Sequence, residues 1–193
     1  MNVPAQLIIL IVPSLVYAAV RRRHREGWRA ILAKIGWSGC SPVYFVWGLG
    51  LAAVLGGLAW LATRSIPAEV FTSPRVSSAS YAGWTRSATT FLRAWGQEVI
   101  ATTLGEEVFF RGLLGGWLIR RFGFAVGNAA QALLFLLPHL LLLAISLRLW
   151  PLVLLQLLAG WILGWLRDRS GSILPGWLTH SLVNALGAFA AMK

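Results

Sequence analysis

Long apolar segments dominate this sequence, and they restrict the chain to folds that are stable in lipid. Six of them approach or exceed the length of about 20 residues that an α-helix needs to cross a bilayer. Apolar residues make up 58% of the chain and charged residues 12%, which excludes disorder and leaves too few polar side chains to cover a water-soluble domain. The predicted spans are 3–20, 42–62, 87–119, 124–145, 151–166 and 173–192. We therefore expect an all-α fold, a polytopic membrane helix bundle of about six transmembrane helices.

Basic residues lie between these spans, and their distribution predicts the topology. The net charge is +11, and much of it lies after the first, third and fifth spans, which places it on one side of the membrane. Basic residues beside spans mark the cytoplasmic side. We therefore expect contact with anionic lipid, no nucleic-acid partner and an N-terminus outside. The clusters are Arg21, Arg22, Arg23, Arg25, Arg29 and Lys34; Arg120 and Arg121; and Arg167 and Arg169.

The first span is predicted to be a retained anchor. A signal peptide carries its basic residues before the apolar stretch, whereas here none precedes it and three arginines follow it at once. We expect one transmembrane domain over 1–193, with anchor spans and an outer loop in 1–86 and a motif-bearing catalytic core in 87–193.

The outer loop, 63–86, has two possible interpretations. It is either a plain connector or a substrate-facing interfacial segment, since Phe71, Tyr81 and Trp84 can lie among lipid headgroups. The span after it, 87–119, exceeds the membrane thickness, so we expect it to be tilted, kinked or partly interfacial.

Ionisable side chains inside an apolar span are costly unless they are paired or hydrated, so each is a functional candidate. Glu107 and Arg111 are four residues apart and can form an ion pair on one helix face. Glu106 is rotated by about 100° from Glu107 and has no basic residue on its own face. A buried carboxylate without a local cation is a candidate general base, although this pattern alone is also compatible with a structural role. Glu98 is unexplained: it faces a water-filled entrance or lies near the interface.

Two further polar motifs lie in later spans. His139 ends a weak polar stripe that includes Asn128 and Gln131, which indicates that it faces the bundle interior. His180 and Asn184 are one turn apart on one face, so they could hold a developing oxyanion. Considered alone, each motif is also explained by hydrogen bonds within the core.

The depths of these motifs in the membrane favour a common site. At a rise of about 1.5 Å per residue, Glu106, His139, Asn184 and His180 lie roughly 20, 23, 17 and 11 Å from the cytoplasmic ends of their spans. Unrelated structural groups on three helices have no reason to lie within about two turns of one level. We therefore predict a single buried polar active site near mid-membrane.

The ordered motifs resemble a known family. Glu-Glu-x-x-x-Arg in 106–111, Phe-x-x-x-His in 135–139 and His-x-x-x-Asn in 180–184 are similar to the motifs of the CPBP family of CAAX proteases and bacteriocin-processing enzymes, which includes the type II CAAX prenyl endopeptidases. The resemblance covers the chain from about residue 87 onward and implies an intramembrane endopeptidase. It implies that Glu106 and His139 activate water, that His180 and Asn184 stabilise the oxyanion, and that Glu107 and Arg111 form a supporting ion pair.

The cofactor, substrate and location are expectations of the same resemblance. We favour a mechanism without a cofactor, in part because a helical His-x-x-x-His pair is absent. A zinc-dependent version is the alternative, since two histidines and a glutamate can also hold zinc. The expected partners are the lipid bilayer and a membrane protein or lipid-associated peptide, such as a C-terminal sorting-anchor, CAAX-like or bacteriocin-type peptide.

Two other functions compete with proteolysis. The first is a non-proteolytic membrane immunity or scaffold protein. The second is a transporter, although no inverted repeat supports it. For all three functions we expect a multi-pass integral protein of a prokaryotic cytoplasmic membrane.

Overall fold

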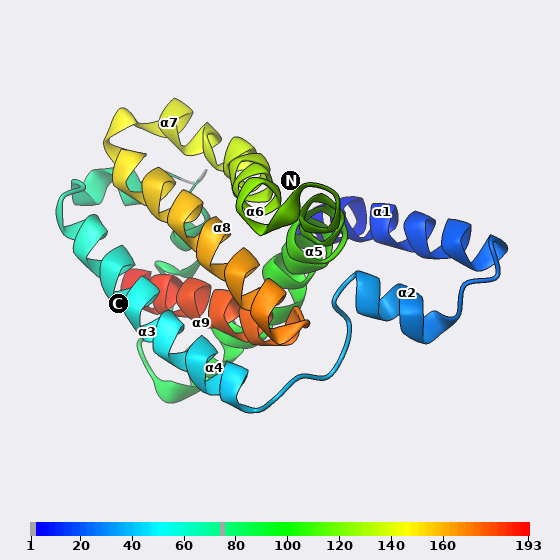
Figure 1. Ribbon diagram of the computed structural model, residues 1–193. Helices are drawn as coiled ribbons and strands as arrows, with labels where there is room; N and C mark the ends of the chain where they lie inside the picture. Colours follow the sequence, from blue (N-terminus) through cyan, green and yellow to red (C-terminus); the bar gives the residue numbers. More distant parts are fainter. Residues whose placement is uncertain (1–2, 74–75) are drawn as a thin grey trace.

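The computed structural model describes residues 3–73 and 76–193, and within these ranges the chain forms helices and connecting segments without a strand (Figure 1). This confirms the all-α prediction. The α-helices are α1 (Val3–Arg23), α2 (Trp28–Lys34), α3 (Val43–Arg64), α4 (Ala88–Gln97), α5 (Leu104–Glu106), α6 (Gly116–His139), α7 (Leu141–Ile145), α8 (Trp150–Ser170) and α9 (Leu174–Ala191). The other helical segments are the 3₁₀ turns η1 (Ala68–Thr72), η2 (Ser77–Tyr81) and η5 (Leu147–Leu149), and the π-helices η3 (Glu98–Thr103) and η4 (Glu107–Gly115).

The predicted spans correspond closely to the observed helices. Four helical segments of the described chain are long and apolar enough to cross a membrane: Ala5–Arg23, Val43–Arg64, Ala88–Ile145 and Leu147–Ser170. The third has 58 residues and corresponds to the predicted spans 87–119 and 124–145. Gly123, with φ 78° and ψ 168°, interrupts the helix between these two spans. Helix α9 coincides with the sixth predicted span but carries the polar motif of His180 and Asn184. The prediction of about six spans is therefore approximately correct.

The segment from α4 to α6 positions most of the polar side chains. It begins at a capping box, in which the Ser87 hydroxyl accepts a hydrogen bond from the Thr90 amide at 3.1 Å. It then continues through η3, α5 and η4, so the long helix predicted for 87–119 is locally widened into π-helix in two places. Such widening is frequent at functional sites. Gly112 lets η4 approach the C-terminal end of α2, because a Cβ there would lie 2.5 Å from the Ile35 carbonyl oxygen.

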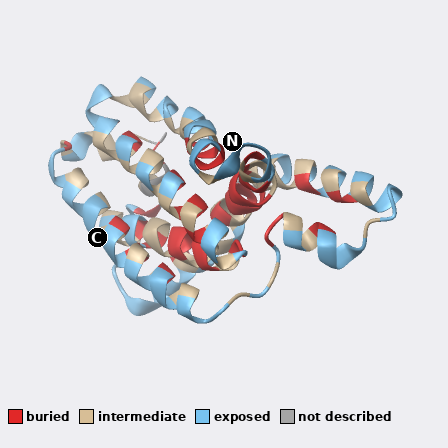
Figure 2. Cartoon of the chain, in the orientation of Figure 1, coloured by how far each residue is buried: buried red, intermediate tan, exposed pale blue. Residues whose placement is uncertain are grey.

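This bundle exposes many large apolar side chains and buries a group of polar ones. Figure 2 shows buried residues concentrated along α5, η4 and α9, whereas the outer faces of α1 and α3 are largely exposed. Exposed side chains include Ile8, Val46, Trp60 and Leu154, all of them apolar. The buried polar residues are Ser14, Glu98, Thr103, Glu106, Glu107, Arg111, Asn128, Gln131, Ser172, Thr179, His180 and Ser181. Lipid contacts outside and polar contacts inside are the pattern of an integral membrane protein.

The three basic clusters meet at one end of the bundle. Nη1 of Arg120 donates to the Lys34 carbonyl at 2.9 Å, and Nη2 of Arg167 donates to the same carbonyl at 3.4 Å. Glu26 pairs with Lys34 and Arg21 there, and these cations hold the pKa of Glu26 below its ordinary value of 4.5. Their convergence is the arrangement expected if all three clusters lie on the same side of the membrane.

The segment 76–86 is tied to the C-terminal end of α9. The Arg86 amide donates to the carbonyl of Lys193, and the Lys193 amide donates to the carbonyl of Trp84. Tyr81 packs with Ala188 in a small buried apolar cluster. The segment 76–86 therefore lies against α4 and α9.

Candidate active site

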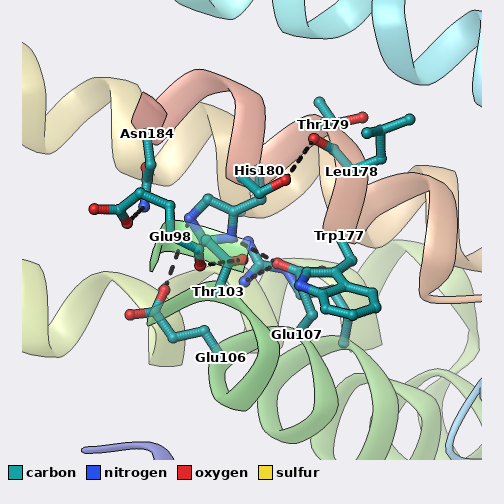
Figure 3. A network of polar contacts seen from close by, with 12 residues as sticks. Glu98, Thr103, Glu106, Glu107, Trp177, Leu178, Thr179, His180 and Asn184 are labelled. Carbon is teal, nitrogen blue, oxygen red and sulfur yellow. Dashed lines mark hydrogen bonds and ion pairs between the residues drawn. The ribbon is translucent and has the colours of Figure 1, made fainter. Parts of the chain in front are cut away.

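Helix α9 packs against η3, and its polar side chains meet those of the acidic residues there and in the segment that follows (Figure 3). Oε1 of Glu107 lies 2.8 Å from Nδ1 of His180 and 3.2 Å from Nη1 of Arg111. Glu107 and Arg111 are both fully buried. The predicted ion pair is present, and its carboxylate also contacts Nδ1 of His180. An ionised carboxylate only accepts hydrogen bonds, so Nδ1 is the donor in this contact.

Glu106 lies on the other side of the same imidazole. Its Oε2 is 3.7 Å from Nε2 of His180, and its Oε1 accepts a hydrogen bond from Nε2 of Gln6 at 2.7 Å. The distance of 3.7 Å is too long for a direct hydrogen bond but is short enough for one small molecule to contact both groups. His180 therefore stands between two carboxylates, one bonded to it and one across a gap.

Gln6 is a site residue that sequence reasoning missed. It belongs to α1, which packs against α5 and η4, and Gly105 permits this approach, since a Cβ there would lie 3.3 Å from Cβ of Leu10. A signal was present in the sequence, because Gln6 is an amide within an otherwise strongly apolar span.

Asn184 and His180 are one turn apart, but they contact different carboxylates. Nδ2 of Asn184 donates to Oε2 of Glu98 at 3.1 Å, while the Tyr81 hydroxyl donates to Oε1 of Glu98 at 2.9 Å. Glu98, which the sequence left unexplained, is therefore a buried neighbour of the site.

His139 joins this cluster through an aromatic ring. Its Nδ1 hydrogen-bonds the carbonyl of Phe135 at 2.8 Å. The Phe135 ring lies 4.5 Å from the His139 ring and 6.0 Å from the His180 ring, measured between centroids. The guanidinium carbon of Arg111 lies 3.9 Å from the centroid of the same ring. Phe135 thus contacts three of the predicted site residues.

The polar stripe before His139 has a packing role. Nδ2 of Asn128 donates to the carbonyl of Trp161 at 3.0 Å, and Nε2 of Gln131 donates to the carbonyl of Gly160 at 2.7 Å. Both contacts join α6 to α8. The stripe faces the bundle interior as predicted, and it fixes the helix that carries His139.

The long apolar helices, with an acid–histidine cluster buried between them, define the protein as an integral membrane protein. The family described as type II CAAX prenyl endopeptidase Rce1-like matches residues 88–186, slightly more than half of the chain. The chain therefore belongs to the Rce1-like family, and the protein is a CAAX-type intramembrane protease. Comparisons with curated proteins and with solved structures found no match.

The matched region covers the three motifs and also Glu98. Two polar neighbours of the site, Gln6 and Tyr81, lie outside it. The site therefore combines family positions with contacts from the N-terminal part of the chain.

Proposed function

We propose that the protein hydrolyses a peptide bond near the C-terminal or membrane-embedded tail of its substrate, using water activated by a glutamate and a histidine. The arrangement around His180 carries this proposal: Nδ1 is bonded to Glu107, while Nε2 lies 3.7 Å from Oε2 of Glu106. Glu107 orients the imidazole as a carboxylate orients the histidine of a hydrolytic triad. A water beside this pair can hydrogen-bond to both Oε2 of Glu106 and Nε2 of His180.

In the proposed reaction, Glu106 takes a proton from water while the water oxygen attacks the scissile carbonyl carbon. The resulting oxyanion accepts hydrogen bonds from Asn184 and from Nε2 of His180, which donates when the imidazole carries both protons. As the C–N bond breaks, Glu106 returns the proton to the leaving amine. His139 activates the water together with Glu106, the role that the family resemblance implies.

The metal-free form of this mechanism is supported by the way the side chains are grouped. Within residues 3–73 and 76–193, no three His, Cys, Asp or Glu side chains lie together so that they could hold a metal ion. Nδ1 of His139 is bonded to a backbone carbonyl, and Nδ1 of His180 is bonded to Glu107, which fixes both imidazoles without a metal. No step of the proposed mechanism involves zinc.

An apolar groove supports a lipid-associated substrate. It has a volume of about 270 Å³ and lies between α3, α4, η3 and α9. Its lining includes Val99, which follows Glu98, and Ser181, which follows His180, together with Trp95 and Trp177. A groove of this kind suits an apolar chain better than a soluble peptide. We propose that a transmembrane or lipid-associated tail, such as a sorting-anchor, CAAX-like or bacteriocin-type peptide, lies beside it.

The convergence of the basic clusters supports a topology with this end in the cytoplasm and the N-terminus outside. We propose a prokaryotic cytoplasmic membrane as the location. Modification of single cysteines by a membrane-impermeant thiol reagent tests this topology, with Cys40 first replaced by serine. We expect the reagent to label Ser65→Cys from outside and to leave Arg25→Cys unlabelled.

The activity test is cleavage of an internally quenched, farnesylated peptide ending in a CAAX sequence by the purified protein in liposomes. We expect Glu106→Gln to lower kcat by about 10²- to 10⁴-fold. The matched control is Glu26→Gln, which removes a carboxylate at the basic end and is expected to leave kcat within about twofold.

Three results would contradict parts of this proposal. Equal cleavage by the wild type and Glu106→Gln excludes Glu106 as the base. A wild type that cleaves neither this peptide, its non-prenylated counterpart nor a transmembrane peptide favours the immunity or scaffold function. Activity that is lost with a chelator and restored by zinc favours the zinc-dependent alternative.

A further inference from the structure

Glu98 is a buried carboxylate that the proposed mechanism does not use. It is 9% exposed, and both of its oxygens accept hydrogen bonds from neutral groups, the Tyr81 hydroxyl and the Asn184 amide. Burial of a carboxylate without a cation is costly. Hydrogen bonds to both oxygens reduce this cost, and they also fix the carboxylate in one orientation.

The π-helix η3 turns the side chain of Glu98 toward the side of this helical segment that carries Glu106. Eight α-helical residues would rotate one side chain by about 80° relative to the other. A π-helix closes each turn with an i→i+5 hydrogen bond and so takes more residues per turn, which reduces this rotation. Figure 3 shows both carboxylates directed toward α9, where Glu98 meets Asn184 and Glu106 faces His180.

Each polar side chain of the α9 motif therefore has its own carboxylate. Glu107 accepts a hydrogen bond from Nδ1 of His180 at 2.8 Å, and Glu98 accepts one from Nδ2 of Asn184 at 3.1 Å. A carboxylate accepts but does not donate, so Glu98 selects the amide nitrogen of Asn184 and excludes the flipped orientation. One N–H of this amide is then used by Glu98, and the second N–H points elsewhere.

Tyr81 and Asn184 each bind one oxygen of Glu98. The Tyr81 hydroxyl donates to Oε1, and Asn184 donates to Oε2. Burial and the neighbouring carboxylate raise the pKa of Tyr81, so its hydroxyl remains a donor at physiological pH. The outer loop thereby contacts the site through one residue.

We infer that Glu98 is a positioning residue, which holds the Asn184 amide so that its second N–H points to the place where the oxyanion forms. This inference rests on the proposed function, because it requires a tetrahedral oxyanion beside Asn184. Glu98 itself does not touch the substrate. It acts through the orientation of Asn184, and its length matters more than its charge.

Two substitutions separate the effect of side-chain length at position 98 from the effect of its charge. Gln at position 98 keeps the length, and its amide can accept from Asn184 and donate to the Tyr81 oxygen. Asp keeps the charge but withdraws the carboxylate by about 1.5 Å, one carbon–carbon bond. The test compares Glu98→Gln and Glu98→Asp, each in the wild-type background and in the Asn184→Ala background. The probe is the quenched farnesylated CAAX peptide, and rates are normalised to folded protein.

We expect Glu98→Asp to lower kcat by about 10- to 100-fold with KM within about twofold, since a misdirected oxyanion donor affects the transition state. Glu98→Gln is expected to retain at least about a third of kcat. In the Asn184→Ala background, Glu98→Asp should add less than about twofold, because a residue that acts only through Asn184 has nothing left to orient.

The outcomes that overturn this inference differ from those that overturn the proposed function. A greater loss with Gln than with Asp would assign the effect to charge. Additive losses in the double variant would show that Glu98 acts independently of Asn184. A kcat for Glu98→Asp within about twofold of wild type would remove the positioning role, while the protease function stands. A wild type that cleaves no peptide overturns the proposed function, and this inference with it.

Discussion

Replacement of Arg111 by methionine tests the electrostatic support of the site. Arg111 is fully buried, and its Nη1 lies 3.2 Å from Oε1 of Glu107. Removal of one partner from a buried ion pair costs about 3–5 kcal/mol, because the other charge stays buried without a counter-ion. None of the Arg111 side-chain nitrogens has an aligned hydrogen-bond partner in the described chain. Methionine also keeps a contact with the Phe135 ring. We therefore expect the lower end of this range, about 3 kcal/mol.

A double variant separates the loss of charge from the loss of packing. Glu107→Gln together with Arg111→Met removes both charges, and Gln can still accept a hydrogen bond from Nδ1 of His180. Neutral groups of similar volume often replace a buried ion pair without loss of stability. The double variant should therefore lie within about 1 kcal/mol of wild type. The coupling energy should then be at least about 2 kcal/mol, and it is larger by the cost of Glu107→Gln alone.

The measurement is the free energy of unfolding in detergent micelles, obtained from denaturant titration followed by circular dichroism. Arg148→Met is the matched control, since Arg148 is exposed and its loss should change stability by less than about 0.5 kcal/mol. The electrostatic reasoning fails if Arg111→Met costs less than about 1 kcal/mol. It also fails if the two single losses add in the double variant.

Three further predictions concern contacts outside this pair. Gln6→Leu removes the donor to Glu106 at 2.7 Å and should lower the free energy of unfolding by about 1.5–3 kcal/mol; an unchanged denaturant midpoint would contradict the contact. Gly112→Ala places a Cβ 2.5 Å from the carbonyl oxygen at the C-terminal end of α2 and should destabilise by about 1–3 kcal/mol, which the same titration measures. Because Lys34 holds the pKa of Glu26 below 4.5, the stabilising contribution of Glu26 is present above pH 4.5 and is lost as the pH falls through the lowered pKa. The melting temperature of Glu26→Gln should therefore depend less on pH in the acid range than that of the wild type.

Hydropathy and charge predicted the helices well, because both depend on local composition. The predicted span 42–62 corresponds to α3 at Val43–Arg64, and 151–166 corresponds to α8 at Trp150–Ser170. The gap predicted between the third and fourth spans contains Gly123, whose φ of 78° interrupts the helix. The length needed to cross an apolar medium dictates the two spans, and a glycine with positive φ accounts for the break.

Side-chain pairs within one helix were also predictable. Glu107 and Arg111 meet because four residues make about one turn. The contacts of Gln6 and Tyr81 were not predictable, since each joins an N-terminal segment to the core over a long sequence separation. Periodicity describes which residues share a face of one helix, but it does not say which helix packs against that face.

The register of the acidic helix explains why Glu98 had no assigned role in the sequence. An ideal α-helix places Glu98 about 80° away from Glu106, which directs the two carboxylates to different neighbours. The π-helix η3 begins at Glu98 and reduces this rotation, so that α9 can contact both carboxylates from residues one turn apart. The polar motif of α9 therefore depends on a local departure from 3.6 residues per turn. A change that restored ordinary α-helix between these glutamates would separate Asn184 from Glu98 while leaving the pair of Glu107 and His180 in place.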